Sequence, residues 1–284
     1  MINDSELILN QDGSVYHLNL LPEDIAEQII FVGDQERVPL VSRYFDKIET
    51  KKGKREFITH TGYLNGQRIS VVSTGIGTDN IDIVINEIDA LFNIDLATRM
   101  LKSDVKSVDI IRIGTSGSMR QDIEIGQVMA SEFGVGFDAL MQFYKKSYTA
   151  EEEEIRDIIT DAFSEFDIRP YVGKADDSLL NKFAFDLPKG ITVTAPGFYG
   201  PQGRKVRTQD TAPQFVDVAS RLDIEGRHIT SLEMETAGIY ALSNMFGHRA
   251  ISINAILASR VDARFSENPQ QVIEQAIELV LSRF

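Results

Sequence analysis

Short apolar runs that end at glycine constrain the fold of this chain more than any other feature. In residues 108–119, a β-branched run leads to Arg112 and then to the small residues Gly114-Thr115-Ser116-Gly117. Further apolar runs are followed by Gly33, by Gly75-Ile76-Gly77 and by Gly197. Such runs are typical of buried strands, with turns at their ends. Ligands bind outside the carboxyl ends of strands in α/β sheets, so this edge is the predicted ligand face.

The segment after Arg112 has the chemistry of an oxyanion site. A turn at Gly114-Thr115-Ser116-Gly117 is expected to expose backbone N–H groups and hydroxyls at the strand end. The guanidinium of Arg112 adds charge-assisted hydrogen bonds. Together these groups predict a receptacle for a small oxyanion such as phosphate. The alternative interpretation is a polar loop that follows a core strand.

Helical periodicity alternates with these strands along the whole chain. Strands are predicted at 29–32, 108–113, 126–131, 191–195 and 250–256, with a hairpin around Asn65-Gly66. Helices are predicted at 36–45, 79–91 (capped by Thr78 or Asp79), 151–163, 231–246 and from Asn268-Pro269 to the end of the chain. This alternation predicts the α/β class, and we expect one domain over residues 1–284.

Composition excludes several classes of function. A formal net charge of −14 argues against a protein that binds nucleic-acid backbones, although a few local arginines can still hold one phosphate. The absence of cysteine excludes disulfides and thiolate chemistry, and the four histidines lack metal-hydrolase spacing. The N-terminal segment has no signal-peptide pattern, and no apolar run reaches the roughly 20 residues that span a bilayer. We therefore expect a cytoplasmic protein without a membrane partner.

Two further arginines are candidates to join Arg112 on the same anion. Arg37 follows Gly33 by four residues, so its side chain can fold back toward the sheet end. Arg55 lies in the short segment Lys54-Arg55-Glu56-Phe57. Each of them taken alone is more often a surface residue. Gathered on one anion, they would supply partly bidentate hydrogen bonds.

A pair of carboxylates flanks Met234 at the start of the predicted helix 231–246. Buried carboxylates are costly when unpaired, so Glu233 and Glu235 should find donors. Vicinal hydroxyls of a sugar are one such donor pair, with the methionine against the sugar ring. The alternative is that the helix dipole favours negative charge at its N-terminus.

One irregular loop combines an aromatic ring, an amide and a guanidinium. Phe198 can stack on a planar ring, and Gln202 offers both a donor and an acceptor that match an imide edge. Arg204 adds a cation beside them. This loop is a candidate site for a planar heterocycle.

Taken together, these segments resemble the nucleoside phosphorylase-I family, and within it the bacterial enzymes that cleave uridine. The resemblance runs along nearly the whole chain and is carried by residues 32–38 (VGDQERV), 73–77 (STGIG), 112–117 (RIGTSG), 198–204 (FYGPQGR) and 233–235 (EME). It implies a three-layer α/β/α fold around a central mixed twisted sheet. It also implies the reaction of uridine and phosphate to uracil and α-D-ribose 1-phosphate, through an oxocarbenium-like transition state.

The resemblance also implies a role for individual residues. Phosphate would be bound by Gly33, Arg37, Arg112 and Thr115, with Arg55 reaching in from a neighbouring subunit. Ribose would be bound by Glu233, Met234 and Glu235, with His17 of the neighbour at the 5′-hydroxyl. The base would be bound by Ser116, Gly117, Phe198, Gln202 and Arg204, with Ile256 and Leu257 as an apolar wall. The expected catalytic residues are Arg112, Gln202, Arg204 and Glu235.

Other expectations concern cofactors and self-association. No cofactor or catalytic metal is expected, because inorganic phosphate is the co-substrate. Bacterial relatives can hold a monovalent cation at a subunit interface, at positions that match Glu56, Ile69 and Ser73. Family members are dimers or hexamers built from dimers, so at least a dimer with shared sites is expected here.

The identity of the base has alternatives. Purine-cleaving relatives carry an aspartate where this chain reads Ser259-Arg260, although Asp262 lies close by. This difference favours uracil. A purine nucleoside phosphorylase, a pyrimidine phosphorylase of broader specificity, a nucleosidase of the same fold and a non-catalytic nucleoside-binding protein are the alternatives. Ala258-Ser259 stands in place of bulkier residues, so the sequence does not determine the volume of the base pocket.

Overall fold

The computed structural model describes residues 1–208 and 214–284, and most of its strands join one mixed sheet. The strands are β1 (Gln28–Val32), β2 (Lys47–Lys54), β3 (Phe57–Leu64), β4 (Gln67–Ser73), β5 (Ile94–Asp95), β6 (Met100–Leu101), β7 (Asp109–Ser118), β8 (Val128–Gly136), β9 (Tyr171–Lys174), β10 (Lys189–Thr194), β11 (Asp223–Ile224), β12 (Arg227–Glu233), β13 (Arg249–Ser259) and β14 (Arg264–Phe265). Strands β5 and β6 form a separate small hairpin.

The helices alternate with these strands. They are α1 (Arg37–Ser42), α2 (Thr78–Asn93), α3 (Ala150–Ala162), α4 (Asp177–Phe183), α5 (Phe215–Arg221), α6 (Thr236–Phe246) and α7 (Pro269–Leu281), with short 3-10 turns at Pro22–Asp24, Leu140–Gln142 and Gly200–Gln202. Within the described residues, no helix is long and apolar enough to cross a membrane. Pro39 lies in the first turn of α1, where its missing N–H costs nothing.

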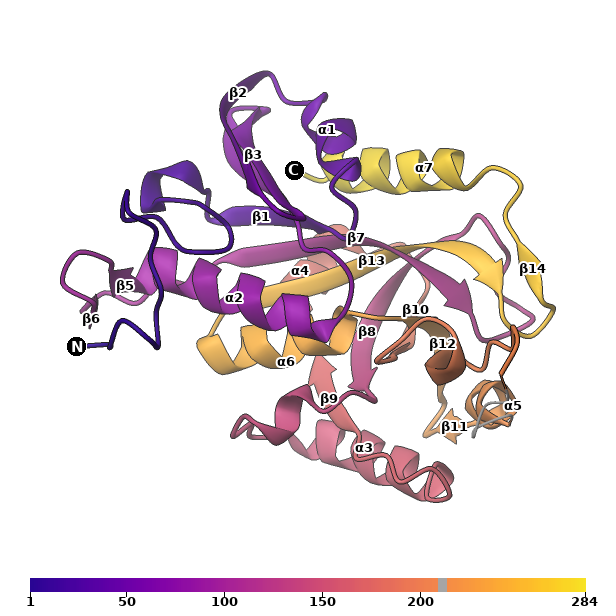
Figure 1. Cartoon of the computed structure of the whole chain (residues 1–284). Coiled ribbons are helices and arrows are strands. Elements are labelled where there is room, and N and C mark those ends of the chain that lie inside the picture. The colour runs from indigo at the N-terminus through magenta and orange to yellow at the C-terminus, as the bar shows by residue number, and fades with distance from the viewer. Residues whose placement is uncertain (209–213) are drawn as a thin grey trace.

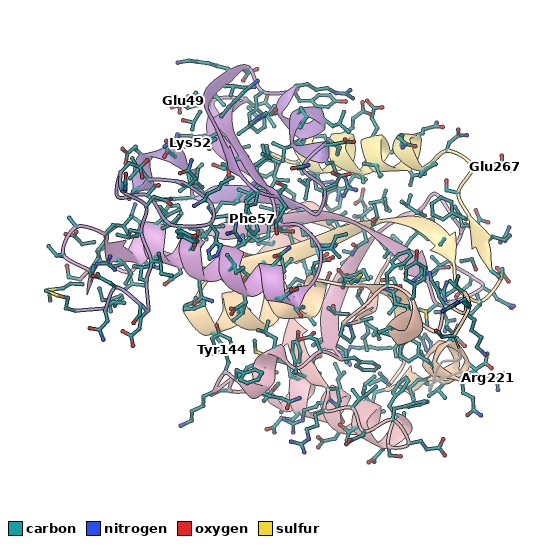
Figure 2. All side chains as sticks on the ribbon, viewed as in Figure 1. Glu49, Lys52, Phe57, Tyr144, Arg221 and Glu267 are labelled. Atoms are coloured by element: carbon teal, nitrogen blue, oxygen red, sulfur yellow. The ribbon has the colours of Figure 1, made fainter. Side chains whose placement is uncertain are left out.

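The sheet forms the middle of three layers, which confirms the predicted α/β/α architecture. Its main path runs β11-β12-β10-β8-β13-β7-β1-β4-β3-β2, and β7 is parallel to both β1 and β13. Helices α2 and α6 lie on one side of it, and α1 and α7 lie on the other (Figure 1). The central strands are buried on both faces because helices cover both sides. Charged Glu49, Arg221 and Glu267 lie on the periphery, whereas Phe57 lies inside (Figure 2).

The small residues of α6 let it pack closely on the sheet. A Cβ atom added to Gly134 of β8 would lie 2.7 Å from the Cα atom of Ala237. A Cβ atom added to Gly173 of β9 would lie 2.7 Å from the Cβ of Tyr240. Real Cβ atoms do not approach this closely, so glycines on the strands and small residues on the helix set the distance between the two layers.

The predicted turn at Gly114-Thr115-Ser116-Gly117 is wrong, because β7 continues to Ser118. Arg112 is therefore the fourth residue of a ten-residue strand and does not end it. Residues 114–118 pair with β13, and Gly117 also pairs with Leu232 of β12. The backbone of this segment is paired with the neighbouring strands and does not form a loop of free amides. The groups that it presents at the ligand edge are therefore side chains.

The predicted helix 231–246 is wrong in its first residues. Glu233 is the last residue of β12, which pairs in parallel with β10, and the helix begins at Thr236. The run Ile229-Thr230-Ser231 fits a buried strand, and the junction between strand and helix falls between the two glutamates.

The cap of α2 also differs from the prediction of Thr78 or Asp79. It is Gly77 with φ +95°, a conformation that favours glycine.

The hydroxyl of Tyr240 links α6 to two strands, and its loss should destabilise the fold. It donates to the carbonyl of Ser131 at 2.6 Å and accepts from the N–H of Ser252 at 2.7 Å. Tyr240→Phe would leave both buried backbone groups unpaired, at a cost of about 1–3 kcal/mol or more. Urea unfolding measures this loss, and Tyr199→Phe, at a residue 59% exposed, is the control. Equal unfolding midpoints for the two variants would contradict the prediction.

Candidate active site

One cavity of about 630 Å³ opens at the carboxyl ends of the central parallel strands. This size suits a small organic ligand. Segments that are far apart in the sequence meet there: the turns after β1 and β4, the end of β7, the loop after β10, the junction of β12 with α6, and the end of β13. Its lining includes Gly33, Arg37, Glu56, Arg112, Thr115, Ser116, Gly117, Phe198, Gln202, Arg204, Glu233, Met234, Glu235, Leu257 and Phe265.

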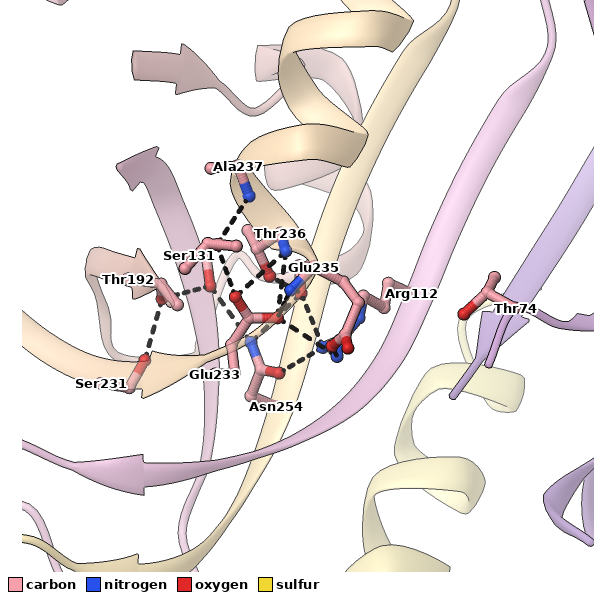
Figure 3. A network of polar contacts seen from close by, with 12 residues as sticks. Thr74, Arg112, Ser131, Thr192, Ser231, Glu233, Glu235, Thr236, Ala237 and Asn254 are labelled. Carbon is pink, nitrogen blue, oxygen red and sulfur yellow. Dashed lines mark hydrogen bonds and ion pairs between the residues drawn. The ribbon is translucent and has the colours of Figure 1, made fainter. Parts of the chain in front are cut away.

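Arg112 is the buried cation at the centre of this cavity. Only 4% of the residue is exposed, and both terminal nitrogens of its guanidinium have protein partners. Nη1 donates to Oδ1 of Asn254 at 2.8 Å, while Nη2 bonds to Glu235 and lies 3.2 Å from Oε2 of Glu233 (Figure 3). Burial alone would lower the pKa of Arg112, but the two carboxylates raise it above the usual value. Arg112 therefore stays charged.

Glu233 is held by the first turn of α6. Its carboxylate accepts hydrogen bonds from the N–H groups of Glu235 and Thr236 at 3.0 Å, and from Oγ1 of Thr194 at 2.6 Å. These amides point along the helix axis and favour negative charge. Glu233 therefore fits the alternative interpretation, in which the helix dipole favours negative charge at the start of a helix. Its carboxylate oxygens already accept hydrogen bonds from donors within the protein.

Glu235 connects Arg112 to the start of α2. Its Oε1 accepts from the N–H of Gly77 at 2.8 Å, and its Oε2 bonds to Arg112. Burial raises the pKa of Glu235, and the nearby charge of Glu233 raises it further, against the lowering effect of Arg112. Because it has fewer protein donors than Glu233, Glu235 is the carboxylate better able to accept from a ligand hydroxyl.

Arg37 folds back to the sheet end, as predicted. Its Nη1 donates to the carbonyl of Ile113 on β7 at 3.3 Å. Burial lowers the pKa of Arg37, and the positive charge of Arg112 lowers it further. Two guanidinium groups that repel each other thus face one cavity, which is an arrangement that an anion between them would stabilise.

The loop at 198–204 forms the other end of the cavity. The guanidinium carbon of Arg204 lies 3.7 Å from the ring centroid of Phe198, and its Nη1 donates to the carbonyl of that residue at 2.6 Å. The same nitrogen bonds to the side-chain oxygen of Gln202, which is 3% exposed. Burial and the charge of Arg260 lower the pKa of Arg204 to about 10. The aromatic ring, amide and guanidinium of the predicted heterocycle site do come together.

Arg260 is a neighbour of this loop that was not among the predicted site residues. Its Nη2 donates to the backbone carbonyl of Gln202 at 2.8 Å. A Cβ atom on Gly117 would lie 3.1 Å from the Cγ and Cδ atoms of Arg260. Its position just beyond the predicted strand 250–256 is the one indication in the sequence that it lies near the ligand edge of the sheet. Arg260 therefore stabilises the loop that carries Gln202.

Some predicted residues lie away from the cavity of their own chain. Arg55 is exposed at the turn between β2 and β3, and the Nδ1 atom of His17 lies 2.7 Å from Glu87. Ile256 is fully buried in a cluster with Ile123 and Met129. Of the two residues expected to form an apolar wall, Leu257 lines the cavity and Ile256 does not.

The three positions matched to a monovalent cation do not converge within one chain. The Ser73 hydroxyl donates to the Glu56 carbonyl at 2.6 Å, so these two residues are neighbours. Ile69 is fully buried on the same strand, four residues earlier, which places its backbone about 13 Å away.

Comparisons with known proteins agree with this geometry. The family model of the phosphorylase superfamily matches residues 27–283. A uridine phosphorylase of Thermococcus kodakarensis is 29% identical over 90% of this chain and 82% of its own length. A DeoD-type purine nucleoside phosphorylase of Bacillus velezensis is 25% identical over 84% of each chain. A Trypanosoma brucei nucleoside phosphorylase, whose structure is described as showing uridine phosphorylase activity, superposes with a TM-score of 0.90 at 28% identity over 98% of each chain.

Gly114 provides a test of the Arg112 geometry. A Cβ atom at this position would overlap Nη1 of Arg112 and Oδ1 of Asn254, so Gly114→Ala must displace the guanidinium. We expect a folded protein whose affinity for inorganic phosphate, measured by calorimetry, falls about 10- to 100-fold, as loss of a charge-assisted bond implies. Gly200→Ala is the control, because a Cβ there meets nothing within 4 Å. Equal affinities would show that Arg112 does not contact phosphate.

Proposed function

Because this chain belongs to the phosphorylase superfamily, we propose that it is a uridine phosphorylase. It would convert uridine and phosphate to uracil and α-D-ribose 1-phosphate. The observation that supports this most is one cavity with paired guanidinium groups at one end and a polar, aromatic loop at the other. Arg37 and Arg112 line the first end, and Gln202 and Arg204 line the second. Phosphate and base could therefore be bound at the same time, on either side of a sugar.

The phosphate would lie against Arg112, Arg37, Gly33 and the hydroxyl of Thr115, all of which line the cavity. Protein partners contact both terminal nitrogens of Arg112, so the anion would be attracted mainly by the positive charge of this guanidinium, which lines the cavity. Each charge-assisted hydrogen bond contributes about 1.5–3 kcal/mol. The two arginines also offset the negative charge of Glu233 and Glu235 beside the phosphate.

The ribose would lie across Met234, with its hydroxyls on Glu235. A carboxylate accepts hydrogen bonds from vicinal hydroxyls, and a thioether packs against an apolar sugar face. Glu235 contacts Arg112 directly, so the groups that bind ribose and phosphate share one ion pair. This pairing would bring the phosphate close to the anomeric carbon.

Donors at the far end of the cavity would assist the departing base. The bond between C1′ and N1 breaks, its electron pair stays on uracil, and a phosphate oxygen forms the new bond to C1′. Arg204 and the amide of Gln202 would stabilise the negative charge on uracil, an electrostatic effect that often dominates catalysis. No side chain needs to act as a nucleophile in this sequence of steps.

The surroundings of Asp262 favour uracil over a purine. Its carboxylate accepts from Oγ of Ser259 at 3.0 Å and lies 3.2 Å from Nη2 of Arg264. Asp262 is also absent from the cavity lining, so it is not placed to give a proton to a purine ring nitrogen. The purine enzymes among the relatives make a purine substrate the second candidate to test.

A nucleoside cleavage assay tests this proposal. Wild-type protein should release uracil from uridine only when phosphate is present, and should cleave inosine and adenosine far more slowly. Arg112→Ala should lower kcat/KM about 100-fold or more while the protein stays folded. Arg249→Ala, at the opposite end of β13, should leave the rate unchanged.

Either of two results would contradict this proposal. Cleavage of inosine in preference to uridine would assign the site to purines. Equal rates of uridine cleavage with and without phosphate would identify a hydrolase.

We also propose that two copies of the chain share their sites. Arg55 and His17 match positions that reach a neighbouring subunit in the family, and neither lines the cavity of its own chain. His17 is oriented by Glu87, which accepts from its ring and from its backbone N–H at 2.9 Å. The ring of His17 is therefore held outside the cavity of its own chain, where it could contact a neighbouring subunit.

Mixing two inactive variants tests this sharing. In a symmetric dimer, Arg112→Ala and Arg55→Ala subunits would combine to form one intact site per mixed dimer. Random reassociation should restore about a quarter of wild-type activity, because half of the dimers are mixed and each has one of two sites intact. No recovery after verified subunit exchange would show that Arg55 does not serve a neighbouring site.

A further inference from the structure

Asn254 is a buried partner of Arg112 on the neighbouring strand. It is 1% exposed and lies on β13 opposite Gly114 of β7. Its Oδ1 accepts the 2.8 Å hydrogen bond from Arg112, and its Nδ2 donates to the hydroxyls of Ser131 and Ser252 at 3.1 Å (Figure 3). All polar atoms of this side chain are therefore paired inside the protein.

The orientation of this amide is forced by chemistry. Arginine can only donate hydrogen bonds, so the oxygen of Asn254 must face Arg112 and its nitrogen must face the hydroxyls. The Ser131 hydroxyl lies 2.6 Å from that of Thr192, which lies 2.8 Å from that of Ser231. This chain of hydroxyls extends the network across β8, β10 and β12. The amide cannot rotate without breaking several buried hydrogen bonds.

We propose that Asn254 is a positioning residue for phosphate binding, acting through Arg112. Glu233 and Glu235 both contact Nη2, so their attraction falls on one end of the guanidinium. Asn254, with Ser252 at 3.5 Å, holds Nη1 against that attraction and so keeps the guanidinium in its place on the cavity wall. Without it, the guanidinium would gain a second bond to a carboxylate, since paired arginine–carboxylate bonds are the stronger geometry. The inference rests on the phosphate-binding role proposed for Arg112.

The effect of Asn254 should fall on phosphate rather than on the nucleoside. We expect Asn254→Ala to raise the dissociation constant of inorganic phosphate about tenfold, the equivalent of one lost hydrogen bond. Asn254→Asp should raise it further, because a third carboxylate beside Arg112 would repel the dianion. KM for uridine should rise less than the dissociation constant of phosphate in both variants, because Asn254 contacts Arg112 directly and reaches Glu235 only through it.

Asn93 provides a matched control for the loss of a buried amide. It is also 1% exposed, and it bonds to Asp89 at 2.6 Å and to the backbone of Lys106 at 2.7 and 3.1 Å. It lies at the end of α2 and does not line the cavity. Asn93→Ala should lower the unfolding temperature as Asn254→Ala does, yet leave the phosphate affinity unchanged.

Phosphate titration by calorimetry without nucleoside, followed by uridine kinetics, decides between the outcomes. Unchanged phosphate affinity in folded Asn254→Ala or Asn254→Asp would overturn the proposal. Equal losses for phosphate and uridine would also overturn it, because they indicate a general structural role. If Asn254→Ala does not fold, the isosteric Asn254→Asp supplies the same test. Wild-type protein that binds phosphate but does not cleave uridine would refute the proposed function alone, whereas wild-type protein that does not bind phosphate would refute both.

Discussion

The buried charge of Arg112 is the constraint on which the rest of the site depends. An arginine that is 4% exposed must have its charge paired, because an unpaired buried charge costs several kcal/mol. Glu233 and Glu235 supply that pairing, so the junction of β12 and α6 has to lie against β7. Glu233 is stabilised in turn by the amides that begin α6, and Glu235 by the amide of Gly77 at the start of α2. One ion cluster thus determines where two helices and two strands meet.

This cluster also couples the proposed binding of two substrates. Glu235 is in direct contact with Arg112, so a ribose hydroxyl on the carboxylate and a phosphate on the guanidinium would be neighbours. The two carboxylates weaken the net positive charge at this end of the cavity, and Arg37 offsets that effect. Asn254 adds a neutral hydrogen bond that orients Arg112 without adding another negative charge. Such preorganised geometry is what an electrostatic mechanism requires.

The sequence predicts much of this arrangement because its signals are local. Alternating strands and helices, the hairpin at Asn65-Gly66 and the folding back of Arg37 follow from periodicity, turn chemistry and short spacings. The extent of β7 does not follow, because Gly114 and its neighbours look like a turn until the pairing with β13 is known.

The same limit applies to Asn254 and Arg260. Each is placed by contacts with strands or loops distant in the sequence, and a position on or just beyond a predicted strand does not show which side chains it will meet. Ile256 lies outside the cavity because its side chain packs against Ile123 and Met129. The spacing of residues in the sequence does not show which face of β13 meets this cluster.

Following the phosphate itself tests the central claim most directly: that an anion held at Arg112 accepts the ribosyl group. In ³¹P NMR of the enzyme with uridine and a limiting amount of phosphate, the inorganic phosphate resonance should decline as uracil appears. A sugar-phosphate resonance should replace it in equal amount. Release of uracil while the phosphate resonance stays constant would contradict the account.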